Sequence, residues 1–428
     1  MGRLIEIGPF IKLQRTKQEM TQGELAEGIV SLSYLSKIEN KKTDASPEII
    51  QLLCNRLGIE LIDGVDTDLQ KKCKQWYAML FDVYDKKEII DTYKDLQALM
   101  DRSINDSFFL FEIHKIRYYI ILRQIDKALS KMNELSEMVN SFDNDHLYYW
   151  YKFKGNYYSF TGEFNQAMRL YKMAEDKINQ VDLDEEEVAD LHYTISVTNS
   201  KLRNTLEVID YANKAMDVFQ RNYNFIRCAQ CHILLGISYR RIDMYDKAIK
   251  NYNLAKHLGE LNKNKQVIQL ANLNLGYAHS KIGNTEEAIK YYVFVIEEED
   301  DEAIKIKERL ASITSLIKEY YNIGDYEKTK EMIKKALTIL DLASDDHYYQ
   351  LYYYIIHTYT YALNNEQEKF RALVTDEFIP YLKQHDDHSN LVVYAKMLGS
   401  HFEKLGKYKE SVKYYKLANS AYNELINL

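Results

Sequence analysis

Three polar side chains near the start of the chain lie on the side of a predicted helix that faces away from its apolar residues. Ser33, Tyr34 and Lys37 share one side of a predicted helix over residues 32–39, with Leu35 and Ile38 on the other side. Hydroxyl and ammonium groups can donate hydrogen bonds to base edges and phosphates, while the apolar pair packs against a preceding helix. The pattern fits a helix-turn-helix whose second helix enters a major groove, although an ordinary helical hairpin has the same periodicity.

A second chemically active group, Cys228-Ala-Gln-Cys231-His232, has the spacing of a c-type haem attachment site. It falls inside a predicted helix, and such attachment requires export, for which the sequence shows no signal. We therefore interpret both cysteines as buried helix residues. The histidines lack metal-ligand spacing, and we find no phosphate-binding glycine loop and no nucleophile motif. We expect no cofactor, no metal and no enzymatic activity.

The elements that position the reading helix can be predicted from capping residues. Thr21 can cap a helix that ends before the reading helix begins, and another helix is expected over residues 5–18. Ser46 and Pro47 have the types preferred at the N-cap and first position of a helix, which Gly58 would end. The first 63 residues are therefore expected to form a small helical domain.

This segment, TQGELAE…SYLSKIEN…SPEIIQLLCNRLGI, resembles the repressor/Cro-type DNA-binding domains of bacterial and phage regulators. The resemblance implies that Gln22 contacts a phosphate and that Ser33, Tyr34 and Lys37 read bases and backbone. Lys41 is expected to join other basic residues on the DNA side. Because the segment is nearly neutral, one copy would bind phosphate weakly, so a homodimer or tetramer reading two half-sites is expected.

Composition bounds the rest of the chain. The 428 residues include only 3 prolines and 15 glycines against 37 tyrosines, which favours an all-α protein. A net charge of −8 argues against a general nucleic-acid coat and fits a soluble cytoplasmic protein. No apolar run approaches the roughly 20 residues that span a bilayer.

Beyond a predicted linker at residues 64–71, the sequence over 72–428 repeats. The segment LLGISYRRIDMYDKAIKNYNLAKHL has counterparts whose anchors, residues 155, 236, 276, 317 and 399, are multiples of about 40 apart. This period predicts nine helix pairs. The pattern resembles a lengthened tetratricopeptide repeat, which implies a right-handed superhelix whose first helices line a concave groove.

The same resemblance assigns polar positions to that groove. Lys152 and Asn156 are one turn apart and are expected to hold a peptide carboxylate, and asparagine amides can pair with a peptide main chain. The alternative is that these residues are polar groups that contact water in the groove and bind no ligand. The candidate peptide-binding residues are Lys152, Asn156, Gln230, Arg240, Asn274, Tyr277, Lys318 and Asn322.

The combination of such a DNA-binding domain with long tetratricopeptide repeats resembles the peptide-pheromone-sensing RRNPP regulators of Gram-positive bacteria, most closely the neutral-protease regulator type. The resemblance implies a quorum-sensing transcriptional regulator in which a short signalling peptide changes oligomer geometry and DNA binding. An alternative is a Rap-like scaffold that inhibits a response regulator or a sporulation phosphorelay protein. In that case the N-terminal domain would serve mainly for assembly.

Overall fold

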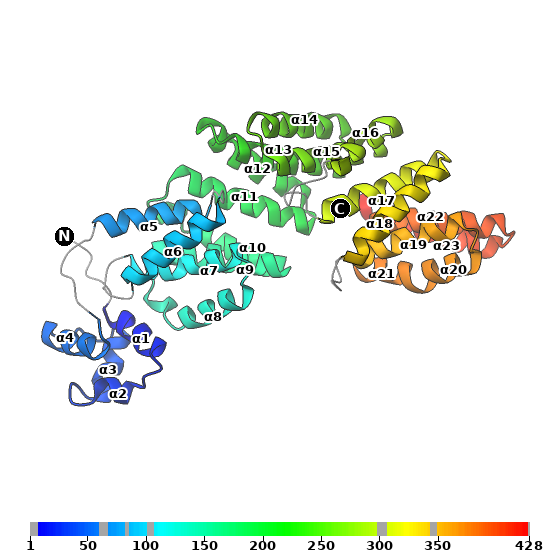
Figure 1. Ribbon diagram of the computed structural model, residues 1–428. Coiled ribbons are helices and arrows are strands. Elements are labelled where there is room, and N and C mark those ends of the chain that lie inside the picture. Colours follow the sequence, from blue (N-terminus) through cyan, green and yellow to red (C-terminus); the bar gives the residue numbers. More distant parts are fainter. Residues whose placement is uncertain are drawn as a thin grey trace. The chain divides into compact units, whose positions relative to one another are not determined.

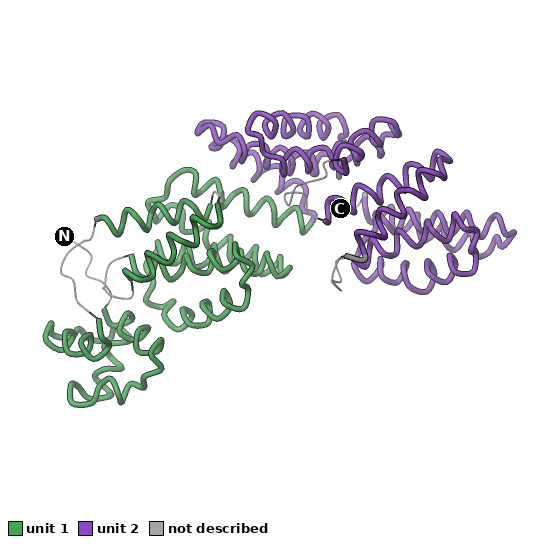
Figure 2. The backbone as a smooth tube through the Cα atoms, in the orientation of Figure 1, with its two compact units in different colours: residues 1–202 green, residues 203–428 purple. Residues whose placement is uncertain are grey.

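The computed structural model describes residues 7–59, 67–81, 85–100, 107–297, 306–342 and 349–426. Every regular element within these ranges is helical, which confirms the predicted all-α class. No helix in the described ranges is long and apolar enough to cross a membrane. The chain divides into two compact units, residues 1–202 and 203–428 (Figure 2). Residues 64–66 of the predicted linker lie outside the described residues, and a helix already begins at Thr67.

The N-terminal domain, here called the head, begins unit 1 (Figure 1). Its helices are α1 (Ile7–Lys17), α2 (Gln22–Ala26), α3 (Leu32–Glu39) and α4 (Pro47–Arg56). Thr21 and Glu24 form a capping box at α2, as expected for an N-cap threonine followed by glutamate. Ser31 caps α3 by accepting a hydrogen bond from the Tyr34 amide. The predicted bounds of the reading helix are confirmed.

Close packing of α1 against α3 sets the geometry of the head. Phe10, Leu25, Leu35 and Leu53 are fully buried and supply its core. Gly8 of α1 touches the backbone of α3 so closely that any Cβ there would collide with a main-chain carbonyl. Such a contact cannot yield by rotating a side chain, so glycine is required where the two helices cross.

The remainder of unit 1 consists of three helix pairs and α11. The elements are α5 (Thr67–Met79), α6 (Lys86–Met100), α7 (Phe108–Ile121), α8 (Ile125–Ser136), η1 (Val139–Ser141), α9 (Asn144–Thr161), α10 (Phe164–Glu175), η2 (Ile178–Gln180) and α11 (Glu185–Leu202). Fully buried Trp76 lies among Tyr93, Phe111 and Tyr118 at ring-centroid distances of 5.8, 5.2 and 5.7 Å. Aromatic side chains from three helices thus fill the start of the repeat stack.

Unit 2 begins with α12 and continues through five helix pairs. The elements are α12 (Thr205–Arg221), α13 (Phe225–Arg241), α14 (Tyr245–Leu261), α15 (Lys265–Lys281), α16 (Thr285–Glu297), α17 (Ile306–Asn322), α18 (Tyr326–Leu342), α19 (Gln350–Leu363), α20 (Gln367–Ala372), η4 (Leu373–Phe378), α21 (Ile379–Gln384), α22 (His388–Lys404) and α23 (Tyr408–Ile426). Eight pairs therefore lie within the described parts of the two units, and α11 and α12, the last helix of unit 1 and the first of unit 2, follow one another in the chain where the period places one more.

Glycine–tyrosine contacts hold the two helices of a pair together. Gly155 faces the ring of Tyr171, and a Cβ on Gly155 would lie 2.5 Å from that ring. Gly236 meets Tyr252 in the same way, and both tyrosines are fully buried. Small residues thus permit the two helices of a pair to approach closely. Tyr252 also joins a buried cluster with Leu275 and Ala278 of α15, so its ring links its own pair to the next one.

The second helix of the pair that begins with α19 departs from the regular pattern. Between α20 and α21 the chain forms a π-helical turn over Leu373–Phe378, and Pro380 is the second residue of α21. Proline cannot donate the backbone hydrogen bond that a regular α-helix needs at this position, and π-turns relieve such a break. The proline is visible in the sequence, but the repeat period does not predict the π-helical turn that precedes it.

Candidate functional site

The reading helix α3 presents polar side chains outward. Ser33 and Lys37 are exposed, while Leu35 and Ile38 are buried on the opposite side. The Tyr34 hydroxyl donates to the Asp44 carbonyl at 3.2 Å, which holds the ring beside the helix. The structure thus brings the three predicted reading residues to one open edge.

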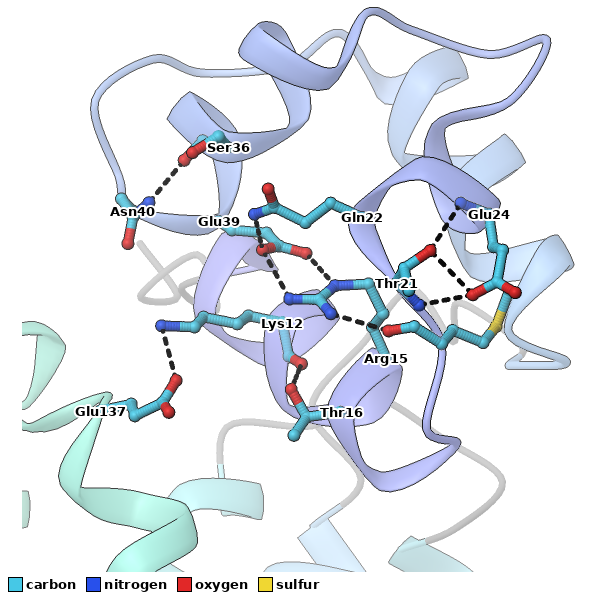
Figure 3. A network of polar contacts seen from close by, with 11 residues as sticks. Lys12, Arg15, Thr16, Thr21, Gln22, Glu24, Ser36, Glu39, Asn40 and Glu137 are labelled. Carbon is cyan, nitrogen blue, oxygen red and sulfur yellow. Dashed lines mark hydrogen bonds and ion pairs between the residues drawn. The ribbon is translucent and has the colours of Figure 1, made fainter.

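Glu39 joins three helices of the head through its buried carboxylate (Figure 3). Arg15 of α1 binds it with two N–H groups, Nε at 2.7 Å and Nη2 at 3.1 Å. Gln22 of α2 donates to the same carboxylate at 2.7 Å, and Arg15 also donates to the Met20 carbonyl at 2.8 Å. A bidentate arginine–carboxylate pair fixes orientation as well as distance. One N–H of the Gln22 amide therefore helps to position α3 and is directed at Glu39 rather than at the phosphate expected of it.

Lys41 also differs from its expected role. Its ammonium group donates to the Ser141 carbonyl of η1 at 2.6 Å, so it is turned toward the repeats in this structure. Conversely, Leu32 at the start of α3 is 56% exposed beside Ser33. Sequence reasoning passed over Leu32, because an isolated leucine at a helix start has the pattern of a core residue.

The expected Lys152–Asn156 clamp is not formed. Lys152 is fully buried, pairs with Asp190 at 3.0 Å, and lies 4.6 Å from the Phe81 ring centroid. The side-chain Oδ1 of Asn156 accepts a hydrogen bond from the Tyr171 hydroxyl at 2.9 Å. The prediction is wrong for Lys152 as an open groove residue, because a ligand could reach its charge only by breaking the pair with Asp190.

Within unit 2, cationic side chains gather along the first helices of successive pairs. The Arg240 guanidinium of α13 lies over the ring of Tyr277 of α15, 5.7 Å from its centroid. Lys318 of α17 donates to Asn390 at 3.3 Å and lies 5.5 Å from the Tyr394 ring centroid. The predicted groove residues Arg240, Tyr277 and Lys318 thus lie on α13, α15 and α17, the first helices of three successive pairs.

Lys281 and Lys396, which the sequence analysis did not identify, lie near the predicted residues Arg240 and Lys318. Burial, with the nearby charge of Lys281 acting in the same direction, lowers the pKa of Lys318 to about 8 against the opposing pull of Asp387. Burial likewise lowers the pKa of Lys281, with Arg240 and Lys396 adding repulsion. Lys281 follows its repeat anchor Gly276 by the same five residues that separate Arg241 from Gly236, a register that could have identified it. We call Arg240, Arg241, Lys281, Lys318 and Lys396 the cationic face.

The other predicted groove residues differ in availability. The side-chain Oε1 of Gln230 accepts a hydrogen bond from Arg227 at 3.2 Å. Asn274 is buried and donates to the Leu270 carbonyl of its own helix at 2.8 Å. Asn322 is exposed at the end of α17. Asn322 is thus the most accessible of these amides.

Cys228 and Cys231 are buried in α13, as expected. Burial raises the pKa of their thiols to about 11 and about 12 respectively, so both are protonated at neutral pH. His232 packs beside them and its ring Nδ1 lies 2.9 Å from Asn251 Oδ1. These residues behave as a structural part of the helix rather than as a reactive group.

Comparisons with known proteins agree with this architecture. A helix-turn-helix family model matches residues 11–63, and a tetratricopeptide repeat model matches residues 270–298. The transcriptional activator NprA of Geobacillus stearothermophilus is 31% identical over 409 residues, covering 94% of this chain and all of NprA.

Solved structures share the fold. The apo form of the quorum sensor NprR from B. thuringiensis has a TM-score of 0.68 at 19% identity, with 83% of this chain and 98% of that chain covered. NprR in complex with its cognate peptide NprX has a TM-score of 0.61 at 20% identity, with 84% and 99% covered.

Proposed function

This chain belongs to the family of the transcriptional activator NprA, and from that premise we propose that it is a peptide-gated transcriptional regulator. The head reads operator DNA through α3, and the cationic face of unit 2 binds a short signalling peptide. NprR, which shares the fold, has been solved with a peptide bound. The protein acts in the cytoplasm as a homodimer or tetramer, because one nearly neutral head holds DNA weakly.

The exposed edge of α3 supports the DNA-binding half of the proposal. Ser33 and Lys37 offer hydrogen-bond donors, and the exposed Leu32 side chain suits contact with a thymine methyl group. The buried Arg15–Glu39 pair holds α3 rigidly against α1, so the edge is preorganised.

The cationic face is the observation that carries the peptide-binding half. Burial is the main cause that lowers the pKa of Lys281 and Lys318, and neighbouring cations add repulsion that an anionic guest would offset. The ring of Tyr277 beneath Arg240 adds a flat apolar surface beside the charges. We therefore propose a ligand with an acidic side chain or a free terminal carboxylate, with the exposed Asn322 amide able to pair with a peptide main chain.

Peptide binding and DNA binding can be tested together on the full chain. Synthetic peptides of about five to ten residues, with sequences encoded beside the gene, would be titrated into a mixture of the protein and a pool of random DNA duplexes. We expect one acidic peptide to bind and to change DNA retention, and its terminally amidated or Asp→Asn form to bind at least about tenfold more weakly. Binding of amidated and acidic forms with equal affinity would refute the role of the cationic face. Failure of every peptide to alter DNA retention would refute the coupling.

A further inference from the structure

The head is held against the first repeats by a defined set of contacts. Phe10 of α1 packs edge-on against Phe108 of α7, with 4.7 Å between ring centroids, and both are essentially fully buried. Lys17 lies 5.1 Å from the centroid of the same Phe108 ring. Lys12 pairs with Glu137 at 3.2 Å, as Figure 3 shows. One face of α1 therefore meets a matching surface of the repeats.

A buried carboxylate lies at the centre of this contact. Glu112 of α7 is fully buried, and its Oε1 accepts from Lys17 at 3.0 Å and from Lys115 at 2.6 Å. Its Oε2 accepts from Lys131 of α8 at 2.7 Å. Burial alone raises the pKa of Glu112, but the three lysines outweigh burial and hold it well below its usual range. The carboxylate is thus charged, and a head lysine completes its coordination.

The arrangement of charges allows the head to separate from α7 and α8 without leaving a buried charge unpaired. When Lys17 withdraws, Glu112 keeps Lys115 and Lys131, and Lys17 itself is already 23% exposed at its side chain. An uncompensated buried charge is what makes broken ion pairs costly, and none is created here. The contact has the properties of a reversible dock rather than a permanent core.

We propose that the surface formed by α7, α8 and η1 is a docking site for the α1 face of the head, locked by the insertion of Lys17 at Glu112. In the docked state Ser33 and Lys37 remain exposed. Lys41 is held by the Ser141 carbonyl at 2.6 Å and is turned from the DNA side. The head is therefore positioned by the repeats themselves, and a change in α7 or α8 moves the reading helix directly.

Hydrogen exchange on the full chain tests the dock without DNA or peptide, so its result is independent of the proposed function. The variant Lys17→Ala removes the lock, and Lys42→Ala removes an exposed head charge that has no described contact with the repeats. We expect Lys17→Ala to accelerate exchange about tenfold in α1 and in η1, and Lys42→Ala to leave both unchanged. Equal exchange in the two variants would overturn the proposal.

A charge swap covers the case in which Lys17→Ala unfolds the head, which faster exchange in α3 would reveal. Lys12→Glu faces Glu137 with a like charge and is expected to accelerate exchange in α1 and η1. The double variant Lys12→Glu with Glu137→Lys restores the opposite charges and is expected to restore protection. Failure of the double variant to recover protection would show that the two surfaces do not meet in solution.

Discussion

Lys318 is expected to destabilise the free protein while serving its ligand site. Its pKa falls from an ordinary value near 10.5 to about 8 because of burial and the nearby Lys281 charge. A shift of 2.5 units at about 1.36 kcal/mol per unit is about 3 kcal/mol of lost stability whenever Lys318 is charged. Lys318→Met keeps much of the side-chain volume and removes the charge. At pH 7 we expect the free energy of unfolding of this variant to exceed that of the wild-type protein by up to about 3 kcal/mol.

The pH dependence has a defined sign. Between pH 8 and 10.5 the unfolded chain holds the Lys318 proton and the folded chain does not, so wild-type stability rises with pH there. The advantage of Lys318→Met is then expected to shrink by about 1 kcal/mol per pH unit, from about 3 kcal/mol at pH 7 to about 1 kcal/mol at pH 9.5. Taking the difference between the two proteins cancels Lys115, whose burial also lowers its pKa to about 8.

The assay is urea unfolding followed by circular dichroism at several pH values between 7 and 9.5. Lys416→Met on the exposed side of α23 is the matched control, and its free energy of unfolding should stay within about 0.5 kcal/mol of wild type. A Lys318→Met variant that is less stable than this control, with a difference that does not vary with pH, would refute the reasoning.

Three further changes test other parts of the structure. Lys37→Ala is expected to weaken binding to the preferred operator about 10- to 100-fold while changing non-specific DNA binding much less, measured by fluorescence anisotropy. Gly236→Ala drives a Cβ into the buried Tyr252 ring and should destabilise unit 2 by about 1–3 kcal/mol in urea unfolding. Glu39→Gln leaves Arg15 without its buried charge partner, so α3 amides should exchange about 100-fold faster, while unchanged exchange would contradict the bracing role.

Much of the fold could be predicted because it rests on local and periodic signals. The bounds of α3 follow from Ser31 as a cap and from the spacing of Leu35 and Ile38. The helix pairs follow from a period of about 40 residues and from glycines such as Gly236 that must meet a large ring. These signals depend on neighbours along the chain or on one repeated contact, so a single sequence contains them.

The candidate sites could be predicted less well, because they depend on partners distant in sequence. Lys152 is on the expected helix, but Asp190, 38 positions later, pairs with it and buries it. Gln22 occupies the expected position, but Glu39 binds its amide. The dock was missed for the same reason: Lys17 and Glu112 are 95 positions apart, and no periodicity links a head residue to a repeat residue.

The tyrosines packed inside the helix pairs give this protein an internal reporter of its own alkaline unfolding. Burial raises the pKa of Tyr77, Tyr148, Tyr292 and Tyr394 well above the ordinary value, whereas in an unfolded chain these phenols ionise near about pH 10. Phenolate absorbance from these rings should therefore emerge only as the pairs come apart. Because they lie in α5, α9, α16 and α22, replacing one of them by phenylalanine at a time would show which stretch of the stack opens first.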